Sequence, residues 1–471
     1  MATEHIKEFT PLELPIYKTK YNSSYKQFDK YFLFIERGFE LLKKGGYFGY
    51  IVPSKFAKVG AGKKLRNLLV SDKAVQQIIS FGAHQVFHNK TTYTCILILK
   101  KEKLNQVKYL EVNSLKDWRT RNIGAENFDE FTTDSLKENG WILYPSALKP
   151  AYASIVSQSK PLEDLIGSDN IYNGIQTSAN NIYIHYIKKE DNNFIYFTKN
   201  GKDWKIEKIL TRPYFKTSNG DDNLYTYRPF SPNAFVIYPY LKTDDGLEFV
   251  NIKDLKTNYP NAYKYLIHYK DKLDNEKRDI KPKPETENEW YRYGRHQSLE
   301  KCDVPAKIIV GVLAQGNKYA IDYYGTLISS GGTAGYCMIT LPKDFPYSIY
   351  YIQALLNSKY LEWFSALIGE VFRGGYIARG TKVLKKLPIR IIDFDDKSEK
   401  EIHDKIAGIQ KELIELQGKI DKHRDSRRKV IPFKREFDAL KIELDDTLKT
   451  LYNLGEADSL IPLISELYAT T

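Results

Sequence analysis

The chain has 471 residues, of which 42% are hydrophobic and 28% charged, a balance that excludes disordered and fibrous proteins and predicts two to four globular domains. Its three cysteines, Cys95, Cys302 and Cys337, are too few and too scattered for a disulfide framework or a zinc cluster, which points to the cytoplasm and predicts no metal site. The net charge of +12 allows a nucleic-acid partner, whereas the lack of an apolar run near ~18 residues, or of a signal-peptide core, excludes membrane and secreted classes.

The first 100 residues alternate between helix and strand patterns. The periodicity predicts a helix over 29–42 behind an Asp29 cap, a strand over 47–53, a helix over 60–70, and strands over 74–80 and 93–100. Alternating helices and strands predict an α/β fold with a parallel sheet. The link 81–92 is too short for a crossover helix, so we expect the last two strands to pair antiparallel.

The middle of the chain has a looser pattern. Strand-like pieces at 181–186 and 234–240 alternate with turn-rich stretches such as 217–223, and the charged, proline-containing segment 271–289 predicts an exposed excursion. Residues 306–340 predict three short strands with a glycine-rich turn. A single helix is expected over 348–368.

The C-terminal segment has heptad spacing. Apolar residues recur at intervals of four and three from Ile402 to Ile420, and a second apolar stripe runs from Phe437 to Leu451. A basic break at 423–432 separates the two stripes. The pattern predicts an antiparallel helical hairpin, and its simplest role is packing or dimerisation without chemistry.

Positive charge is concentrated in two segments that contain no acidic residue. Residues 41–70 carry seven Lys and Arg and residues 371–390 carry six, together slightly more than the net charge of the whole chain. With 36 tyrosines in the chain, such segments suit a phosphate backbone with stacked or groove-read bases. The alternative interpretation is solvated surfaces and ordinary strand tyrosines.

Short motifs give no independent assignment. The run from Gly60 to Lys63 lacks the spacing of a Walker loop, because residue 57 is not glycine and Lys64 follows Lys63. It also lacks the third glycine of the dinucleotide-binding pattern.

Longer segments resemble a known family. The run DKYFLFIERGFELLKKGGYFGYIVPSKF (29–56), continued by GAHQVFHNKTTYTCILILK (82–100), is similar to the second half of the catalytic domain of TaqI-like N6-adenine DNA methyltransferases, including the fused type IIG restriction–modification enzymes. GIQTSANNIYI (174–184) and 233–240 resemble the start of their target-recognition region. Residues 290–301, 335–342 and 376–389 resemble the TaqI-like C-terminal specificity domain. These pieces lie along residues 25–395.

The resemblance implies roles for particular residues. These enzymes swing the target adenine out of the duplex, and an aromatic side chain stacks on it, which recovers about 1–3 kcal/mol per base. Phe87 occupies the stacking position, with Tyr93 as a weaker candidate. The alternative is that Phe87 packs beneath the sheet. The expected DNA-binding residues are Lys55, Lys58, Lys63, Lys64, Arg292, Arg295, Arg373, Arg379, Lys382, Lys385 and Lys386.

The sequence departs from the family pattern at two motifs. The acidic-and-glycine motif that binds S-adenosylmethionine is missing, and so is the Asn-Pro-Pro-Tyr tetrad, since the chain contains no Pro-Pro dipeptide. The resemblance therefore implies that the main cofactor site and the catalytic tetrad belong to an N-terminal methyltransferase, or nuclease–methyltransferase, half encoded upstream. Without that half, one sheet edge should be exposed and the isolated chain inactive and marginally soluble.

The sequence thus predicts a partial Rossmann-like methyltransferase sheet, a mixed α+β target-recognition domain and a C-terminal helical hairpin. The expected boundaries are 1–110 for the half catalytic domain, 111–300 for the linker and first recognition part, 301–397 for the specificity domain and 398–471 for the hairpin. The expected function is DNA recognition and target-adenine positioning within a site-specific methyltransferase. Two alternatives are a stand-alone, non-catalytic specificity subunit of a restriction–modification or phage-defence complex, and a degenerate gene product that folds poorly.

Overall fold

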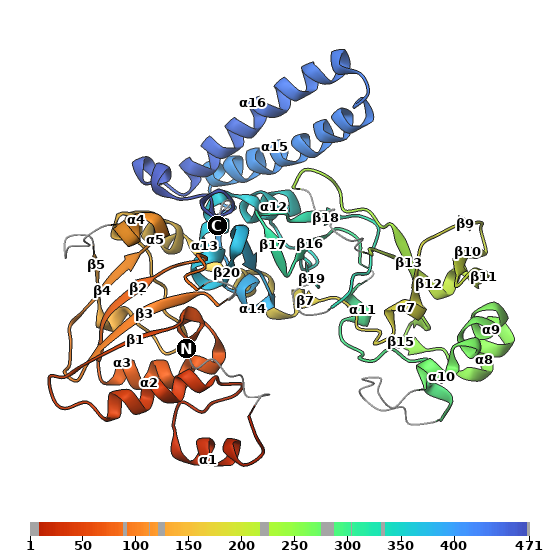
Figure 1. Ribbon diagram of the computed structural model, residues 1–471. Coiled ribbons are helices and arrows are strands. Elements are labelled where there is room, and N and C mark those ends of the chain that lie inside the picture. The colour runs from red at the N-terminus through yellow and green to blue at the C-terminus, as the bar shows by residue number, and fades with distance from the viewer. Residues whose placement is uncertain are drawn as a thin grey trace. The chain divides into compact units, whose positions relative to one another are not determined.

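A computed structural model describes residues 9–87, 92–112, 114–120, 128–216, 226–274, 287–302, 304–330 and 335–468. The chain forms two compact units (Figure 1). Unit 1 contains residues 1–158, 359–378 and 452–471, and unit 2 contains residues 159–358 and 379–451. Each unit is therefore assembled from segments that lie far apart in the sequence.

Unit 1 is built on a five-stranded sheet in the order β1-β3-β2-β4-β5. Its strands are β1 (Tyr47–Pro53), β2 (Val75–Ser80), β3 (Thr94–Lys100), β4 (Gln106–Glu111) and β5 (Asp129–Thr132). The predicted antiparallel pairing of the last two strands is confirmed, because β2 and β3 run antiparallel. The expected parallel sheet is found in part: β2 and β4 are parallel, but β3 inserts between β1 and β2 and is antiparallel to both.

This arrangement gives β1, β2 and β4 one direction, so their carboxyl ends meet at one edge of the sheet. The outer position of β1 also produces the predicted open sheet edge in the described part of the chain. Its first residue, Tyr47, is 61% exposed.

Helices cover both faces of the sheet. On one face lie α2 (Lys30–Glu40) and α3 (Lys63–Ser71), visible in red and orange in Figure 1. The predicted amphipathic stripe of α2 is confirmed, since Phe32, Ile35 and Phe39 are buried in the core on that face. On the other face, Trp118 of α4 (Leu115–Thr120) packs edge-on against Phe81 at 5.5 Å.

Other elements complete unit 1. They are α1 (Glu13–Lys20), α5 (Lys149–Ser157), α13 (Lys359–Ile368), β20 (Val371–Phe372), β21 (Tyr376–Ala378) and α17 (Ile464–Leu467), with short 3₁₀ turns at Ser54–Ala57, Gly60–Gly62 and Gly455–Leu460. The helix expected over 60–70 therefore begins as a 3₁₀ turn. The single helix expected over 348–368 is two helices, α12 (Ile349–Asn357) and α13, interrupted at the extended residue Ser358.

Unit 2 contains several small sheets. The largest has the order β18-β16-β19-β7, from β18 (Ala320–Asp322), β16 (Lys307–Gly311), β19 (Tyr336–Ile339) and β7 (Ile171–Asn173). Smaller sheets pair β12 (Thr211–Tyr214), β13 (Ala234–Ile237) and β8 (Ile184–His185); β9 (Lys189–Glu190), β10 (Phe194–Lys199) and β11 (Lys202–Glu207); β14 (Tyr240–Thr243) with β15 (Gly246–Phe249); and β6 (Ser159–Pro161) with β22 (Pro388–Arg390).

Short helices connect these sheets. They are α6 (Leu162–Ile166), α7 (Asn180–Tyr183), α8 (Ile252–Asn258), α9 (Pro260–His268), α10 (Lys270–Leu273), α11 (Leu299–Cys302) and α14 (Thr381–Leu384). The strand expected over 181–186 is thus mostly the helix α7 followed by β8. Residues 306–340 contain β17 (Leu313–Gln315) in addition to the three predicted strands. The segments 217–223 and most of 271–289 lie outside the described residues.

Tyrosines form much of the core of unit 2. The hydroxyl of Tyr183 donates to the Tyr291 carbonyl oxygen at 2.8 Å, and that of Tyr293 donates to Ile237 O at 2.6 Å. Tyr238 donates to Leu299 O at 2.9 Å. A buried phenol needs such a partner. The abundance of tyrosine in this unit is therefore explained largely by core packing.

The predicted helical hairpin is confirmed. Helices α15 (Lys397–Lys422) and α16 (Arg427–Leu451) lie side by side in Figure 1, with apolar residues such as Leu413 and Leu444 buried. The turn is shorter than expected, because α16 already begins at Arg427 and includes Pro432.

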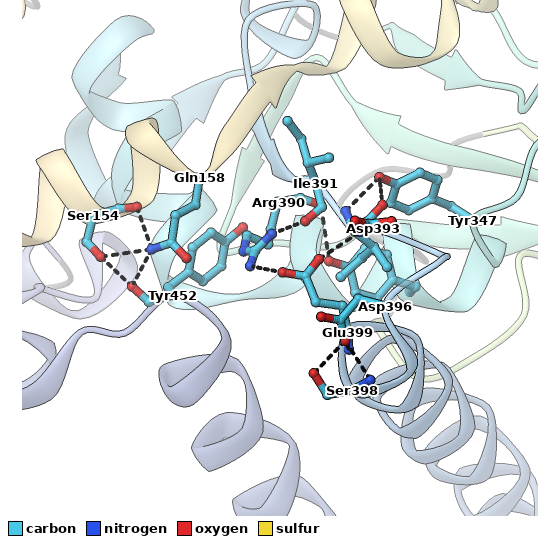
Figure 2. A network of polar contacts seen from close by, with 12 residues as sticks. Ser154, Gln158, Tyr347, Arg390, Ile391, Asp393, Asp396, Ser398, Glu399 and Tyr452 are labelled. Atoms are coloured by element: carbon cyan, nitrogen blue, oxygen red, sulfur yellow. Dashed lines mark hydrogen bonds and ion pairs between the residues drawn. The ribbon is translucent and has the colours of Figure 1, made fainter.

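The base of the hairpin is fixed by polar contacts. The Asp396 carboxylate caps α15 by accepting from the backbone N–H of Ser398 and of Glu399. The Glu399 carboxylate accepts from Arg390 Nη2 at 3.0 Å and from the Asp393 backbone N–H at 2.7 Å, which ties the first turn of α15 to the end of β22 (Figure 2).

Candidate nucleic-acid interface

A cavity of about 530 Å³ opens in unit 1 at the carboxyl ends of β1, β2 and β4. Most of its wall is apolar and aromatic, with Phe56, Trp141 and Trp363 among the lining residues. In open α/β sheets, ligands bind beyond the carboxyl ends of the strands. The position of the cavity therefore matches the general location of a ligand site.

Ionisable side chains line this cavity, among them Glu111 and Lys58. The Glu111 carboxylate at the end of β4 accepts from Tyr468 Oη at 3.3 Å and from Tyr109 Oη at 3.4 Å, and desolvation raises the pKa of Glu111. The Lys58 ammonium donates to the carbonyl oxygens of Ala366 and Gly369, each at 2.7 Å, at the C-terminus of α13. Desolvation lowers the pKa of Lys58 to about 8.

The two aromatic candidates differ in their surroundings. Phe87 is 37% exposed on the segment that follows β2, next to residues 88–91, which lie outside the described part of the chain. Tyr93 lines the cavity; its ring packs edge-on against Phe372 at 5.7 Å, and its Oη accepts from the Arg373 backbone N–H at 2.6 Å. An exposed ring is available for stacking, whereas Tyr93 already has packing partners.

The basic residues of unit 1 are not equivalent. Lys64 is exposed on α3, and the Arg373 side chain is exposed. Lys55 forms an ion pair with Asp29 at 3.2 Å and Lys63 one with Glu138 at 3.2 Å, both with about two-fifths of the lysine side chain exposed. Lys58 is committed to the two carbonyl oxygens of α13, which argues against a phosphate contact by this residue.

The glycine-containing turn before α3 has a structural explanation. A Cβ at Gly62 would lie 2.3 Å from the Phe56 carbonyl oxygen. The buried Arg66 guanidinium fastens the same turn by donating to the carbonyl oxygens of Phe56, Val59 and Glu138. The close approach of two backbone segments therefore accounts for Gly62.

A second cavity, of about 400 Å³, lies in unit 2. Arg292 and Lys385, two predicted DNA-binding residues from distant segments, both line it, together with Lys301 and His296. The Arg292 guanidinium pairs with Glu289 at 2.6 Å and packs over Phe249, with its Cζ 5.1 Å from the ring centre. Lys385 Nζ donates to Ser168 Oγ. The fold thus gathers Arg292, Lys301 and Lys385 around one polar depression, which Asp169 and Glu300 also line.

The remaining predicted residues of unit 2 divide into exposed and buried. Lys382, Lys386 and Arg295 are exposed. Arg379 is fully buried, with Nη1 donating to Ala314 O at 2.8 Å and Nη2 donating to Asn317 Oδ1 at 2.9 Å. Its burial argues against a DNA contact, because the guanidinium organises loops inside the unit.

Sequence reasoning missed Lys301, Glu111 and Tyr468. Lys301 is a single lysine outside the two acid-free segments, so charge clustering could not select it. Glu111 is the last residue of β4, a strand that was not predicted from the sequence. Tyr468 reaches the cavity only because the C-terminal segment returns to unit 1, which no local pattern indicates.

The sequence matches two protein families. Residues 1–87 match the Eco57I restriction-modification methylase family, and residues 247–389 match the TaqI-like C-terminal specificity domain. The second match includes Arg292, Lys301 and Lys385, which line the cavity of unit 2.

Two relatives align with most of this chain. It is 50% identical over 469 residues to the Type II restriction enzyme and methyltransferase RM.Eco57I of Escherichia coli, an alignment that covers 99% of this chain and 47% of that protein. It is 24% identical over 433 residues to the Type II methyltransferase M.HindII of Haemophilus influenzae, covering 85% and 76%. The chain therefore spans about half the length of RM.Eco57I.

A solved structure shares the fold. The Type IIL restriction-modification enzyme MmeI, solved in complex with DNA, aligns with a TM-score of 0.54 at 10% identity, over 99% of this chain and 55% of that one. No helix in the described ranges is both long and apolar enough to span a bilayer. The chain thus carries a match to the Eco57I restriction-modification methylase family over residues 1–87 and one to the TaqI-like C-terminal specificity domain over residues 247–389.

Proposed function

We propose that this chain recognises a DNA site and positions the target adenine for N6-methylation, as the C-terminal part of a type II restriction–modification methyltransferase. The observation that carries the proposal is the gathering of Arg292, Lys301 and Lys385 around one cavity within the segment that matches the specificity domain. Duplex DNA is bound mainly through its phosphates, and base edges supply the sequence information.

The proposed roles differ along the chain. Lys382 and Lys386, which are exposed, contact phosphates, and the cavity of unit 2 faces the groove. In unit 1, Lys55, Lys63, Lys64 and Arg373 contact the backbone beside the flipped nucleotide. Phe87 stacks on the extruded adenine, because its ring is exposed on the segment that follows β2. Tyr93 is the second candidate for that role.

The proposal keeps the domain division predicted from the sequence. The half catalytic domain takes residues 1–110, the linker and first recognition part 111–300, the specificity domain 301–397 and the hairpin 398–471. The return of residues 452–468 to unit 1 adds a C-terminal contribution to the catalytic part.

The methyl donor of the complete enzyme is S-adenosylmethionine in this proposal. The described residues do not fit its main site: β1 ends at Pro53 and is followed by Ser54 and Lys55 rather than by a glycine-rich turn. A partner half that carries the acidic-and-glycine motif and the Pro-Pro-Tyr tetrad would hold the donor. The donor would supply the methyl group, and this chain would orient the base and exclude water.

The experiment is selection of duplexes from a random-sequence pool by the full chain. We expect enrichment of one short motif that contains adenine. Replacing Arg292 or Lys301 by Ala should broaden the enriched motif, whereas replacing the exposed Lys400 on α15 should leave it unchanged. Binding without enrichment of any motif would contradict specific recognition and reduce the function to non-specific DNA binding.

A further inference from the structure

The turn of the α15–α16 hairpin is positively charged, unlike the rest of the hairpin. Residues 423–435, the hairpin tip, carry six basic side chains and one acidic one. Helix α15 carries six of each sign, and residues 436–451 carry two basic and five acidic side chains. The positive charge is therefore confined to one end of an otherwise neutral-to-acidic hairpin.

The basic side chains of the tip are available to a partner. Arg424, Arg427, Arg428, Lys429, Lys434 and Arg435 are all exposed. Within the described ranges, the ion pairs of these six are limited to Arg424 with Asp425, at 4.0 Å. Lysines elsewhere on α15 face acidic neighbours, as in Lys405–Glu443 at 2.8 Å and Lys411–Glu415 at 4.0 Å.

Contacts within unit 2 hold the tip in place. Arg228 binds the Asp421 carboxylate through Nε at 2.5 Å and Nη2 at 2.7 Å, at the last turn of α15. Tyr227 packs edge-on against Phe437 of α16 at 5.1 Å. The His423 and Phe433 rings stack across the turn with an interplanar angle of 16°. A preorganised cationic surface loses less side-chain and loop entropy on binding.

We propose that the hairpin tip is a DNA-backbone contact outside the recognition site. A polyanion with regularly spaced charges suits a surface with five excess positive charges. The 26 residues of α15 span about 39 Å at 1.5 Å per residue, close to the ~34 Å of one DNA turn. The tip can therefore reach phosphates about one helical turn from those bound near β22. This inference rests on the proposed function.

The test compares matched variants of the full chain. The tip variant carries Arg427→Ala, Arg428→Ala and Lys429→Ala, and the control carries Lys397→Ala, Lys400→Ala and Lys411→Ala, which removes three exposed charges from α15. Affinity for a labelled 40-base-pair duplex of arbitrary sequence is measured by fluorescence anisotropy between 50 and 300 mM KCl. We expect the magnitude of the slope of log affinity against log salt to decrease by about two to three in the tip variant, since each phosphate contact contributes about 0.9. The slope should stay unchanged in the control.

A charge-retaining variant separates electrostatics from folding. Arg427→Lys with Arg428→Lys should keep the wild-type slope. Equal slopes for the tip variant and the control would overturn the proposal. If the tip variant changed the sedimentation coefficient but not the slope, the proposal would also be overturned, and the tip would be assigned to self-association. Failure of the wild-type chain to bind the duplex at all would overturn the proposed function as well, so the two failures are distinguishable.

Discussion

Tyr468, near the end of the chain, donates a hydrogen bond from its hydroxyl to Glu111 Oε1 at the end of β4, at 3.3 Å. Its ring packs edge-on against His84 at 5.7 Å. A Cβ at Gly82 would lie 2.3 Å from the same hydroxyl oxygen. The C-terminal segment therefore closes against the start of the loop that carries Phe87, and it contributes to the edge of the sheet where we place the extruded base.

The pH dependence of stability should reveal the buried Glu111 carboxyl. Desolvation raises its pKa above the usual value of 4.5, so the folded state favours the protonated form. The stabilising contribution is fully present below the unfolded-state pKa and is lost as the pH rises through the higher folded-state pKa. Glu111→Gln cannot ionise, so its urea midpoint should exceed that of the wild type at pH 7 and approach it at pH 4.5. Parallel curves would contradict the assignment. Lys58, whose pKa is about 8, stays mainly charged over this range.

His185 should give unit 2 the opposite acid response. Its Nε2 lies 2.7 Å from Ile182 O and 2.8 Å from Tyr265 Oη, its ring stacks on Phe197, and burial lowers its pKa to about 4. A lowered pKa means that stability present above pH 6.5 is lost as the pH falls toward 4. Titration followed by NMR of the His185 ring protons should show no protonation at pH 6. The exposed His296, whose pKa is lowered less, is the internal comparison.

The buried pair of Lys307 and Asp322 should be costly to break. Its atoms lie 2.8 Å apart with both side chains fully buried, and the Asp322 carboxylate also accepts from the Thr326 backbone N–H and hydroxyl. Asp322→Ala leaves the ammonium without its counter-ion and should lower the free energy of unfolding by about 3–5 kcal/mol. Urea denaturation measures this loss. The exposed pair Lys188–Asp203 is the control, and Asp203→Ala should lower the free energy of unfolding much less, because water screens exposed ion pairs.

Base stacking by Phe87 can be separated from DNA affinity. Phe87→Ala removes the exposed ring and should reduce extrusion of the target base in a complex reconstituted with a methyltransferase half, because stacking offsets about 1–3 kcal/mol of the unstacking cost. The fluorescence of 2-aminopurine at the target position measures extrusion. Duplex affinity should change less than threefold. If the variant showed the same fluorescence as the wild type, Phe87 would have a packing role instead. The comparison variant is Tyr93→Phe.

The lysines in and directly after α14 should control the salt dependence of binding. Lys382→Ala with Lys386→Ala removes two exposed charges and should weaken binding to all sequences while lowering the salt slope by about two. Adding Lys385→Ala should lower it by up to one more, although the bond from this lysine to Ser168 reduces its availability. Anisotropy titrations at several KCl concentrations measure the slope. An unchanged slope would mean that these lysines stay solvated and do not contact DNA.

Local patterns in the sequence predicted α2, α3, β1, β2 and β3, the antiparallel pair formed by β2 and β3, and the C-terminal hairpin, but they did not predict α1. Each depends on periodicity or on a short connection, which are properties of neighbouring residues. The placement of the positive charge also came from the sequence, and it pointed to the specificity domain before any contact was known.

The tertiary structure decided which contacts the predicted elements and charged residues make. It inserted β3 between β1 and β2, buried Arg379, engaged Lys58 with the end of α13, and brought Arg292 and Lys385 to one cavity. It also returned Tyr468 to Glu111. Such contacts join segments that lie from about fifty to more than three hundred residues apart, and they depend on desolvation and packing that local propensity does not contain. The sequence alone therefore determined the kinds of chemistry available, and only the fold decided which charges remain free to meet DNA.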